Sequence, residues 1–316
     1  MAELRNTFSW SFSAAEDFDQ CRRKRYWAKY AMWGGWKEDA TPVQKAAYRL
    51  NKMENAYSIL GQAVEAAALW VIRQSQAGTA ATADQAYDAA AKPLLNRAWK
   101  ESREGLWKTS PKKYFCLKEH YYNELDAETQ KQWVSMIVTQ TKRCIGSFID
   151  KVLPRIAHVR QEQEIPVATV AQGDPESFEF EGVKVYAIPD YVYRDGDRLH
   201  IHDWKAGKTR ERHQDQLNLY GLWATVRHRA APDHIRVFAE YLSDGRVDTR
   251  DLTETDIEEV KGRIRESVAE MAEYLVGADA RRNEPMPRED WELAAEPRIC
   301  SLCNFYELCK PELDAL

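Results

Sequence analysis

The spacing of apolar residues changes near Glu164, and this change constrains the fold more than any other feature of the sequence. Before Glu164, apolar side chains recur with the 3.6-residue period of amphipathic helices, as in residues 126–152. After it, they alternate with polar side chains, which is typical of strands that bury one face. The sequence therefore predicts a helical region followed by an α/β core.

The predicted elements follow from this change of period. Helices are expected at residues 13–30, 42–74, 126–152, 214–227 and 253–276, and strands at 165–170, 183–193, 199–204, 235–242 and 246–249. A capping box of Ser13 and Glu16 is expected to begin the first helix, and the second helix could break near Gly61. Asp195-Gly196 and Asp244-Gly245 predict hairpin turns, because glycine readily adopts the positive φ of tight loops.

Composition excludes several classes of protein. The chain has 316 residues, of which 44% are hydrophobic, which is enough to bury a core. Its longest apolar stretch, residues 66–72, is far shorter than the roughly 20 residues needed to cross a bilayer. The first residues do not resemble a secretory signal, so we expect a cytoplasmic protein with reduced thiols. Its six cysteines then indicate metal binding or catalysis rather than disulfides.

Charge is unevenly distributed along the chain. The net charge is -5, but residues 251–316 carry 17 acidic and 8 basic side chains, so residues 1–250 are net positive. Four consecutive bases occupy residues 22–25, and seven more lie between residues 97 and 118. Local basic clusters of this kind attract phosphate groups, whatever the total charge.

The most informative stretch is a predicted hairpin with acidic residues on both strands. If its loop is Asp195-Gly196 or Gly196-Asp197, side-chain alternation places Asp190 on the same sheet face as Asp203 and Lys205. Two carboxylates and an ammonium group among apolar residues are costly unless a cation and a substrate bind there. Mg²⁺ prefers carboxylate oxygens and bridges to phosphate, and the lysine could orient or deprotonate a water molecule. A solvated hairpin face with a surface ion pair would explain the three residues equally well.

Three further residues add to this group. Gln216 and Tyr220 lie four positions apart on a predicted helix, so they share one face and can reach the strand ends. Glu65 lies in the helix predicted at 42–74, and Gly61, one turn earlier, leaves open space beside its carboxylate. Each of these residues alone is typical of a protein surface, and it is their occurrence together that favours a site.

In this order, the residues resemble the PD-(D/E)XK nuclease superfamily, in particular its RecB-like branch with AddB-type and CRISPR-associated exonucleases. Asp190 matches the first acid, residues 203–205 match the (D/E)-x-K element, and residues 216–220 match the Gln-x-x-x-Tyr motif that follows. The resemblance covers roughly residues 8–310 in motif order, with the helical segment between Glu65 and Asp190 as a variable insertion.

The resemblance implies a metal-dependent phosphodiesterase. Its site residues would be Glu65, Asp190, Asp203, Lys205, Gln216 and Tyr220. The three carboxylates would hold one or two Mg²⁺ or Mn²⁺ ions, Lys205 would activate water, and Gln216 and Tyr220 would position Lys205 and the phosphate. One departure is Glu65, because this branch often has histidine there, and the departure leaves the preferred metal open.

The cysteines form a second signal. Cys300, Cys303 and Cys309 follow a C-x2-C-x5-C spacing, and Cys21 lies in the first predicted helix. Tetrahedral zinc and a cubane iron–sulfur cluster are both commonly held by four ligands, so three clustered thiols need a fourth. Iron–sulfur members of the RecB-like branch have one early and three late cysteines, so the resemblance implies a [4Fe-4S] cluster on these four residues. Zinc at the same thiols is the alternative.

Basic and aromatic residues indicate where DNA would bind. Residues 97–118 combine bases with Trp99, Trp107, Tyr114 and Phe115, a composition suited to stacking unpaired bases, although helix packing explains the same aromatics. Five further candidates for DNA contacts are Lys208, Arg210, Arg212, Arg22 and Arg23. The last two would equally fit a solvated helix face.

Four other residues are expected to be structural rather than ligands. Cys116 and Cys144 fit buried small hydrophobic residues. His200 and His202 fall on the opposite strand face from Asp203, where packing or surface roles are expected.

The expected fold is α/β, with a restriction-endonuclease-like core in which helices flank a mixed central sheet. A helical insertion and a cysteine-ligated cluster that joins the N- and C-terminal segments complete it. The expected segments are the N-terminal helices (1–76), the insertion (77–160), the nuclease core (161–280) and the cluster segment (281–316).

The expected function is a metal-dependent DNA nuclease, more narrowly an exonuclease acting on single-stranded ends in repair, CRISPR adaptation or phage defence. Its partners would be DNA with free ends and a helicase, CRISPR-adaptation or defence complex, with no membrane. The alternative is a non-catalytic nucleic-acid-binding subunit of a larger complex that keeps the nuclease fold.

Overall fold

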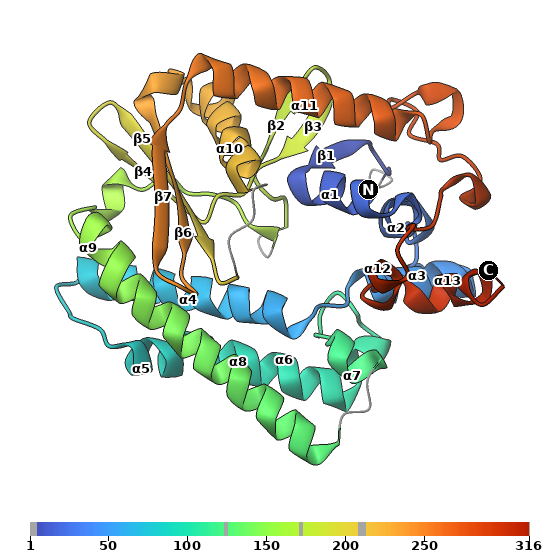
Figure 1. Ribbon diagram of the computed structural model, residues 1–316, viewed down its shortest axis with the longest axis horizontal. Coiled ribbons are helices and arrows are strands. Elements are labelled where there is room, and N and C mark those ends of the chain that lie inside the picture. The colour runs from blue at the N-terminus through green and yellow to red at the C-terminus, as the bar shows by residue number, and fades with distance from the viewer. Residues whose placement is uncertain (1–4, 123–125, 171–172, 208–212, 316) are drawn as a thin grey trace.

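The computed structural model describes residues 5–122, 126–170, 173–207 and 213–315, and within them it contains two β-sheets surrounded by helices (Figure 1). The larger sheet has the order β4-β5-β6-β7. Its strands are β4 (Tyr191–Asp195), β5 (Arg198–Lys205), β6 (Ile235–Tyr241) and β7 (Arg246–Asp251). β5 and β6 are parallel and the outer pairs are antiparallel, so the sheet is mixed, as predicted.

Helices surround the two sheets. The α-helices are α1 (Phe12–Gln20), α2 (Arg22–Tyr26), α3 (Pro42–Asn51), α4 (Ala56–Gln76), α5 (Ala83–Ala86), α6 (Lys92–Glu104), α7 (Lys118–Tyr122), α8 (Ala127–Ser147), α9 (Leu153–Ile156), α10 (His213–His228), α11 (Glu254–Ala272), α12 (Pro297–Ser301) and α13 (Tyr306–Leu313). Shorter 3₁₀ or π turns are η1 (Trp27–Ala31), η2 (Tyr87–Ala91), η3 (Leu106–Lys108), η4 (Phe148–Val152), η5 (Gln161–Gln163), η7 (Pro232–His234), η8 (Val276–Ala278) and η9 (Arg288–Asp290). No described helix is long and apolar enough to cross a membrane.

Helices cover both faces of the larger sheet because its side chains alternate. Ile201 of β5 lies in a core that it shares with Trp223 of α10 and Ile257 of α11. Tyr191 of β4 and Trp204 of β5 lie in a second core, together with residues of α4 and α8. Asp203 and Lys205 share the strand face of Ile201, so the alternation directs them towards the α10 side.

A smaller sheet joins the N-terminus to the middle of the chain. β1 (Ser9–Ser11) pairs in parallel with β3 (Val183–Tyr186), which pairs antiparallel with β2 (Ser177–Phe180). β1 and β2 are absent from the predicted strands because three or four residues are too few to establish an alternation.

Two predicted strands are wrong. The described residues in 165–170 form no strand, and the neighbouring Glu164 makes only an isolated bridge to Tyr193. The single strand predicted at 183–193 is divided into β3 and β4, which belong to different sheets. Pro189 lies between them, and proline has no N–H to donate to a sheet, so the ladder cannot continue through this interval.

The break in the helical region 42–74 is also misplaced by the prediction. It falls at residues 52–55, between α3 and α4, whereas Gly61 lies inside α4. Asn55 starts the second helix, because its side chain accepts a hydrogen bond from Ser58 N at 2.9 Å. Glu65 therefore sits in the interior of a continuous 21-residue helix.

The first helix starts earlier than predicted. Ser11 caps α1 by accepting a hydrogen bond from Ala14 N at 3.2 Å, so the predicted capping box of Ser13 and Glu16 is wrong. Ser11 has the extended backbone that suits an N-cap residue, because it is also the last residue of β1.

Candidate active site

The β4-β5 hairpin brings the two predicted aspartates opposite each other. Asp195 pairs with Arg198, so the loop consists of Gly196 and Asp197, with Gly196 at φ 60°. Extending this register by one residue beyond Tyr191 places Asp190 opposite Asp203. The N–H of Asp190 donates to His202 O at 3.2 Å, which continues the ladder to this point.

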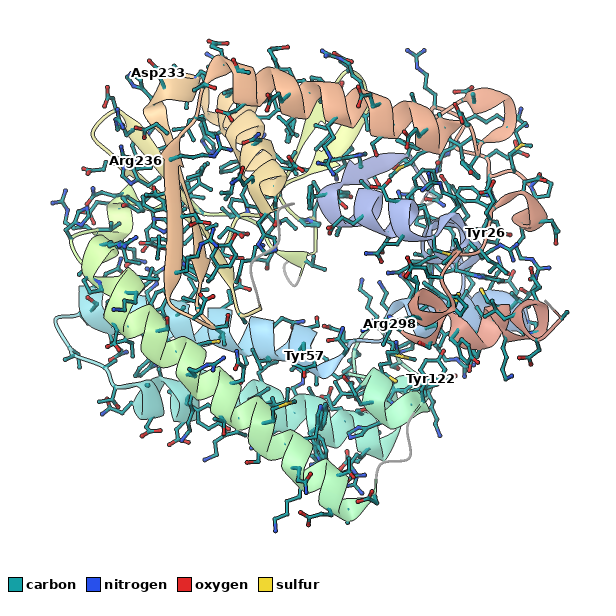
Figure 2. The ribbon with its side chains drawn as sticks, viewed as in Figure 1. Tyr26, Tyr57, Tyr122, Asp233, Arg236 and Arg298 are labelled. Carbon is teal, nitrogen blue, oxygen red and sulfur yellow. The ribbon has the colours of Figure 1, made fainter. Side chains whose placement is uncertain are left out.

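The site lies at the end of the sheet nearest α4. Asp233 and Arg236 mark the region where β6 begins, at the far end of the sheet from α4 (Figure 2). β5 runs parallel to β6, and Lys205 pairs with Tyr241 at the carboxyl end of both strands. The carboxyl ends of β5 and β6 therefore point towards the helix that carries Glu65 (Figure 1).

Four side chains form a closed set of contacts that we call the active-site ring: Asp203, Lys205, Gln216 and Tyr220. Lys205 Nζ lies 2.6 Å from Asp203 Oδ2 and donates to Gln216 Oε1 at 2.7 Å. Gln216 Nε2 donates to the Tyr220 hydroxyl at 2.8 Å, and this hydroxyl lies 3.3 Å from Asp203 Oδ1. Gln216 and Tyr220 thus reach the strand ends from one face of α10, as their spacing predicts.

Electrostatics distinguish the members of this ring. Burial would lower the pKa of Lys205, but the carboxylates of Asp203 and Asp190 outweigh it and raise the pKa above its ordinary value. Burial raises the pKa of Tyr220 far above its usual range, and the negative charges of the two aspartates add to this effect. Lys205 is therefore held as a cation, and Tyr220 as a neutral hydroxyl.

Asp190 lies in a strongly acidic environment. Its Oδ2 accepts a hydrogen bond from Trp204 N at 2.6 Å. Burial raises its pKa well above the usual range, the carboxylates of Asp203 and Glu65 raise it further, and Lys205 opposes them. Carboxylates that converge in this way repel each other, and a bound cation would relieve the repulsion.

Glu65 of α4 and Asp190 line one pocket of about 1090 Å³, which we call the acidic pocket. Burial raises the pKa of Glu65. A methyl group added at Gly61 would meet no atom within 4 Å, so the space beside this part of α4 is open, as predicted.

The donor set fits a divalent cation. Asp203 is 2% exposed, and its Oδ2 contacts the Lys205 ammonium group at 2.6 Å. Asp190 lies opposite Asp203, and the carboxylate of Glu65 lines the same pocket as Asp190. Carboxylate oxygens are the ligands that Mg²⁺ and Mn²⁺ prefer. In the ranges that the structure describes, however, no group of three or more His, Cys, Asp or Glu side chains is already arranged to hold a metal ion.

Four cysteines from the two ends of the chain line a second pocket, of about 300 Å³, which we call the cysteine pocket: Cys21, Cys300, Cys303 and Cys309. None of them forms a disulfide. Trp27 Nε1 donates to Cys309 Sγ at 3.2 Å, and Phe305 N donates to Cys303 Sγ at 3.4 Å. Thiols that share a pocket and receive N–H donors fit a metal or cluster site by their chemistry.

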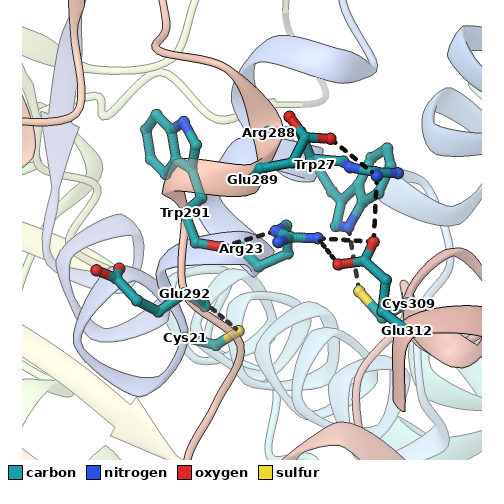
Figure 3. Close-up of polar contacts among 9 residues, drawn as sticks. All are labelled: Cys21, Arg23, Trp27, Arg288, Glu289, Trp291, Glu292, Cys309 and Glu312. Atoms are coloured by element: carbon teal, nitrogen blue, oxygen red, sulfur yellow. Dashed lines mark hydrogen bonds and ion pairs between the residues drawn. The ribbon is translucent and has the colours of Figure 1, made fainter. Parts of the chain in front are cut away.

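Arg23 links the same two chain ends beside the cysteine pocket (Figure 3). Its Nε donates to Trp291 O at 2.7 Å, and its Nη1 lies 3.0 and 2.8 Å from the two carboxylate oxygens of Glu312. Arg288 approaches Glu312 as well, at 3.4 Å. Arg23 is only 3% exposed, and this burial argues against its predicted contact with DNA.

Of the other four predicted DNA contacts, only Arg22 lies within the described residues. Lys208, Arg210 and Arg212 lie outside the described residues. Arg22 is partly exposed and stacks on Phe18, with the centre of its guanidinium 4.0 Å from the ring centroid.

The aromatic residues of the segment 97–118 lie mainly in helix contacts. Trp107 is buried and donates to Ser102 O, while Trp99 packs on Trp133 with ring centroids 5.4 Å apart. Tyr114 and Phe115 are half-buried. Helix packing therefore accounts for Trp107 without a ligand.

Four predicted structural residues are buried or packed as expected. Cys116 and Cys144 are buried, and burial raises their pKa values to about 12 and about 11. His202 stacks on Phe238 at 4.2 Å with its Nδ1 3.0 Å from Glu240 Oε2. His200 stacks on Tyr193 at 4.7 Å.

Sequence reasoning missed a polar cluster at the other end of the acidic pocket. Arg73 and Glu164 line this pocket and form an ion pair of 2.6 Å. Helical spacing gave only a weak signal, because Arg73 follows Glu65 by eight residues on α4, so the two side chains point about 80° apart around the helix.

The α/β fold and the ring of acidic, basic and amide groups are compatible with a metal-dependent nuclease. Comparison with known protein families matches residues 9–310 to the PD-(D/E)XK nuclease superfamily. The match spans nearly the whole chain, and the protein therefore belongs to this superfamily. A search of curated protein sequences found no significant match. Membership agrees with the restriction-endonuclease-like fold and implies a nucleic-acid substrate.

Proposed function

We propose that the protein is a Mg²⁺- or Mn²⁺-dependent deoxyribonuclease of the RecB-like branch that degrades DNA from single-stranded ends. The observation that carries the proposal is the active-site ring beside Asp190, because it joins a buried carboxylate, a charged amine and two positioning groups at the carboxyl end of β5. Without a bound cation, burying several acidic residues together costs free energy.

Each residue has a distinct role in this proposal. Glu65, Asp190 and Asp203 would hold the cation, which when bound supplies a Lewis acid for the phosphate and lowers the pKa of water. Lys205 would orient the attacking water or stabilise negative charge that develops on the phosphate. Gln216 would hold Lys205 in place, and Tyr220 would hold Gln216 and Asp203 through its contacts to both.

The test is cleavage of end-labelled single- and double-stranded DNA with Mg²⁺ or Mn²⁺. Asp203→Ala and Lys205→Ala should each lower kcat by about 10²- to 10⁴-fold. Asp215→Ala is the matched control, because Asp215 is an acidic residue of α10 outside the ring, and it should cleave nearly as wild type. Equal cleavage by all four proteins would mean that the site is elsewhere. Binding without cleavage by wild type would favour a non-catalytic nucleic-acid-binding subunit.

We also propose a [4Fe-4S] cluster at the cysteine pocket. In a cubane each thiolate binds a different iron atom, so its thiols lie further apart than around a single zinc ion. The observation that supports a four-thiolate site is that Cys21 and the three C-terminal cysteines line one pocket, and the RecB-like resemblance favours the cluster over zinc. The cluster would join the N- and C-terminal segments, and a structural role follows from that position.

Metal analysis and visible absorption of anaerobically purified protein test the cluster. Wild type should contain about four irons per chain and absorb visible light, Cys303→Ser should lose both, and Cys116→Ser should keep both. Cys116 is the matched control because it is also buried but lies outside the cysteine pocket. Zinc without iron in wild type would support the alternative.

The setting of the activity follows from the RecB-like resemblance. We propose repair, CRISPR adaptation or phage defence, with a helicase or a defence complex as partner. The division into segments 1–76, 77–160, 161–280 and 281–316 belongs to the same proposal, with the first and last segments united by the cysteine pocket.

A further inference from the structure

The acidic pocket has only one cation among its described lining residues. Its lining carries the carboxylates of Glu54, Glu65, Glu164 and Asp190, and Arg73 is the single basic side chain among them. A nucleic acid is a polyanion, so it needs positive charge wherever its backbone runs along the protein. Among the described lining residues of this pocket, Arg73 is the one that can supply this positive charge.

Arg73 is held in a fixed position. Its Nη1 donates to Glu164 Oε1 at 2.6 Å and to Gln76 Oε1 at 2.7 Å. Glu164 Oε1 in turn accepts hydrogen bonds from Gln76 Nε2 at 2.7 Å and from the Tyr191 hydroxyl at 2.9 Å. Tyr191 is the first residue of β4 and directly follows Asp190, so these contacts link the guanidinium to the residue next to the first acid.

The free edge of Arg73 suits a phosphate. Both protons of Nη1 are used, but Nε and Nη2 have no acceptor among the described residues. These two nitrogens form the planar fork that binds two oxygens of one phosphate. The side chain is 44% exposed, so the fork is accessible, whereas the carboxylate that anchors it is 11% exposed.

We infer that Arg73 is a substrate-binding residue that holds a backbone phosphate of the DNA strand at a distance from the scissile bond. The inference rests on the proposed nuclease function and deepens it. Arg73 lies about 12 Å from Glu65 along α4, so the phosphate it binds belongs to a neighbouring nucleotide and not to the reacting one.

Kinetics of Arg73→Gln and Arg73→Lys test the inference, with Arg265→Gln as the matched control. Arg265 is similarly exposed and similarly paired, with Glu181, but lies outside the acidic pocket. On a labelled single-stranded oligonucleotide, Arg73→Gln should raise KM about tenfold and change kcat less than about twofold. Arg73→Lys should recover part of the loss, because it keeps the charge without the fork.

Salt dependence separates phosphate binding from a structural role. The slope of log KM against log salt should fall by about 0.7 in Arg73→Gln and stay unchanged in Arg265→Gln. A loss of stability without a change in KM or in this slope would overturn the inference, and so would identical KM values for Arg73→Gln and Arg265→Gln.

A second measurement keeps the test independent of catalysis. Fluorescence anisotropy of the same oligonucleotide with Ca²⁺ reports binding even if wild type does not cleave. No cleavage by wild type would defeat the proposed function, while weaker binding by Arg73→Gln than by Arg265→Gln would still support Arg73 as a phosphate contact. Equal binding by the two variants would refute that contact.

Discussion

The active-site ring and the cysteine pocket are built in different ways. Asp203 and Lys205 lie on β5, which has backbone partners on both sides, and Gln216 and Tyr220 lie on a helix of 16 residues. The cysteine pocket instead joins α2, α12 and α13, of 5, 5 and 8 residues, from opposite ends of the chain. Long regular elements carry the residues of the first site, while short helices and the tertiary contacts between them position the second. Substitutions should therefore change chemistry at the ring and folding at the pocket.

Two lysines, one in the ring and one near the chain ends, differ in the groups that surround their ammonium groups. Lys205 has carboxylate neighbours that raise its pKa against the effect of burial. Lys29, near the chain ends, donates to Thr7 O and to Ser9 Oγ, and burial lowers its pKa to about 7, with a smaller contribution from Arg25. An ammonium group surrounded by acids serves a site, whereas one surrounded by neutral acceptors costs stability.

Beyond the loss of Asp203 or Lys205 themselves, the largest effect is expected from loss of the amide that holds Lys205. Gln216→Ala should lower kcat by between about 10- and 100-fold, because Lys205 then loses the acceptor that fixes its position. The melting temperature should change little, since Gln216 is only partly buried. Gln214→Ala, an exposed glutamine on the same helix, is the control. Equal rates for the two variants would show that the ring does not position the amine.

The second prediction concerns the chain ends. Glu312→Ala should lower the free energy of unfolding by about 2 kcal/mol, because it leaves the buried Arg23 guanidinium without its carboxylate. Glu312 is itself partly exposed, which reduces the effect below that of a fully buried pair. Asp314→Ala removes the exposed pair with Lys310 on the same helix and should cost less than about 0.5 kcal/mol. Denaturant unfolding measures both, and similar losses would contradict the comparison.

The third prediction is a pH dependence of stability. Between pH 7 and about 10 the unfolded chain binds more protons at Lys29 than the folded chain, so wild-type stability should rise with pH in this window. Lys29→Met removes this dependence, and the stability difference between wild type and Lys29→Met should move in favour of wild type by about 1–2 kcal/mol from pH 7 to pH 9. Lys100→Met, at an exposed position, is the control. A constant difference across the window would show that burial does not depress the pKa of Lys29.

The smallest effect contrasts two helix glycines. Gly61→Ala should raise the free energy of unfolding by about 0.5–1 kcal/mol, because the added methyl group meets no atom within 4 Å and alanine favours the helix. Gly221→Ala should lower it, because the methyl group would lie 2.1 Å from Leu252 Cδ1. Thermal unfolding checks both. Destabilisation by Gly61→Ala would mean that the space beside Glu65 is needed by the fold.

Strong periodicity allowed several elements to be predicted closely. The strand predicted at 199–204 is observed as β5 (Arg198–Lys205), and the helix predicted at 214–227 is observed as α10. The strand expected at 165–170 is absent, because an apolar alternation does not supply a neighbouring strand with which to pair. β1 is too short to be recognised locally and depends on its partner β3, which lies far along the chain.

In the candidate site too, some features follow from local periodicity and others depend on contacts between distant segments. The shared face of Asp190, Asp203 and Lys205 follows from the two-residue period of a strand and from a two-residue loop, and both are local properties. Arg73 could not be found in this way, since its meaning depends on Glu164, which is 91 residues away and shares no element with it. Likewise, Arg23 is part of a basic run in the sequence, and only the arrival of Trp291 and Glu312 from the far end of the chain buries it.

Local order along the chain thus specifies which groups share a face, because strand and helix geometry repeat every two or 3.6 residues. It accounts for the α/β class, for the acid–acid–lysine set and for the cysteine spacing. The closure of the ring around Lys205, the meeting of the chain ends at Arg23 and the acidic pocket with one arginine depend on tertiary structure. Contacts between segments that are distant in the sequence form only when the whole core is buried together. The pattern of neighbouring residues therefore does not predict which distant segments will meet.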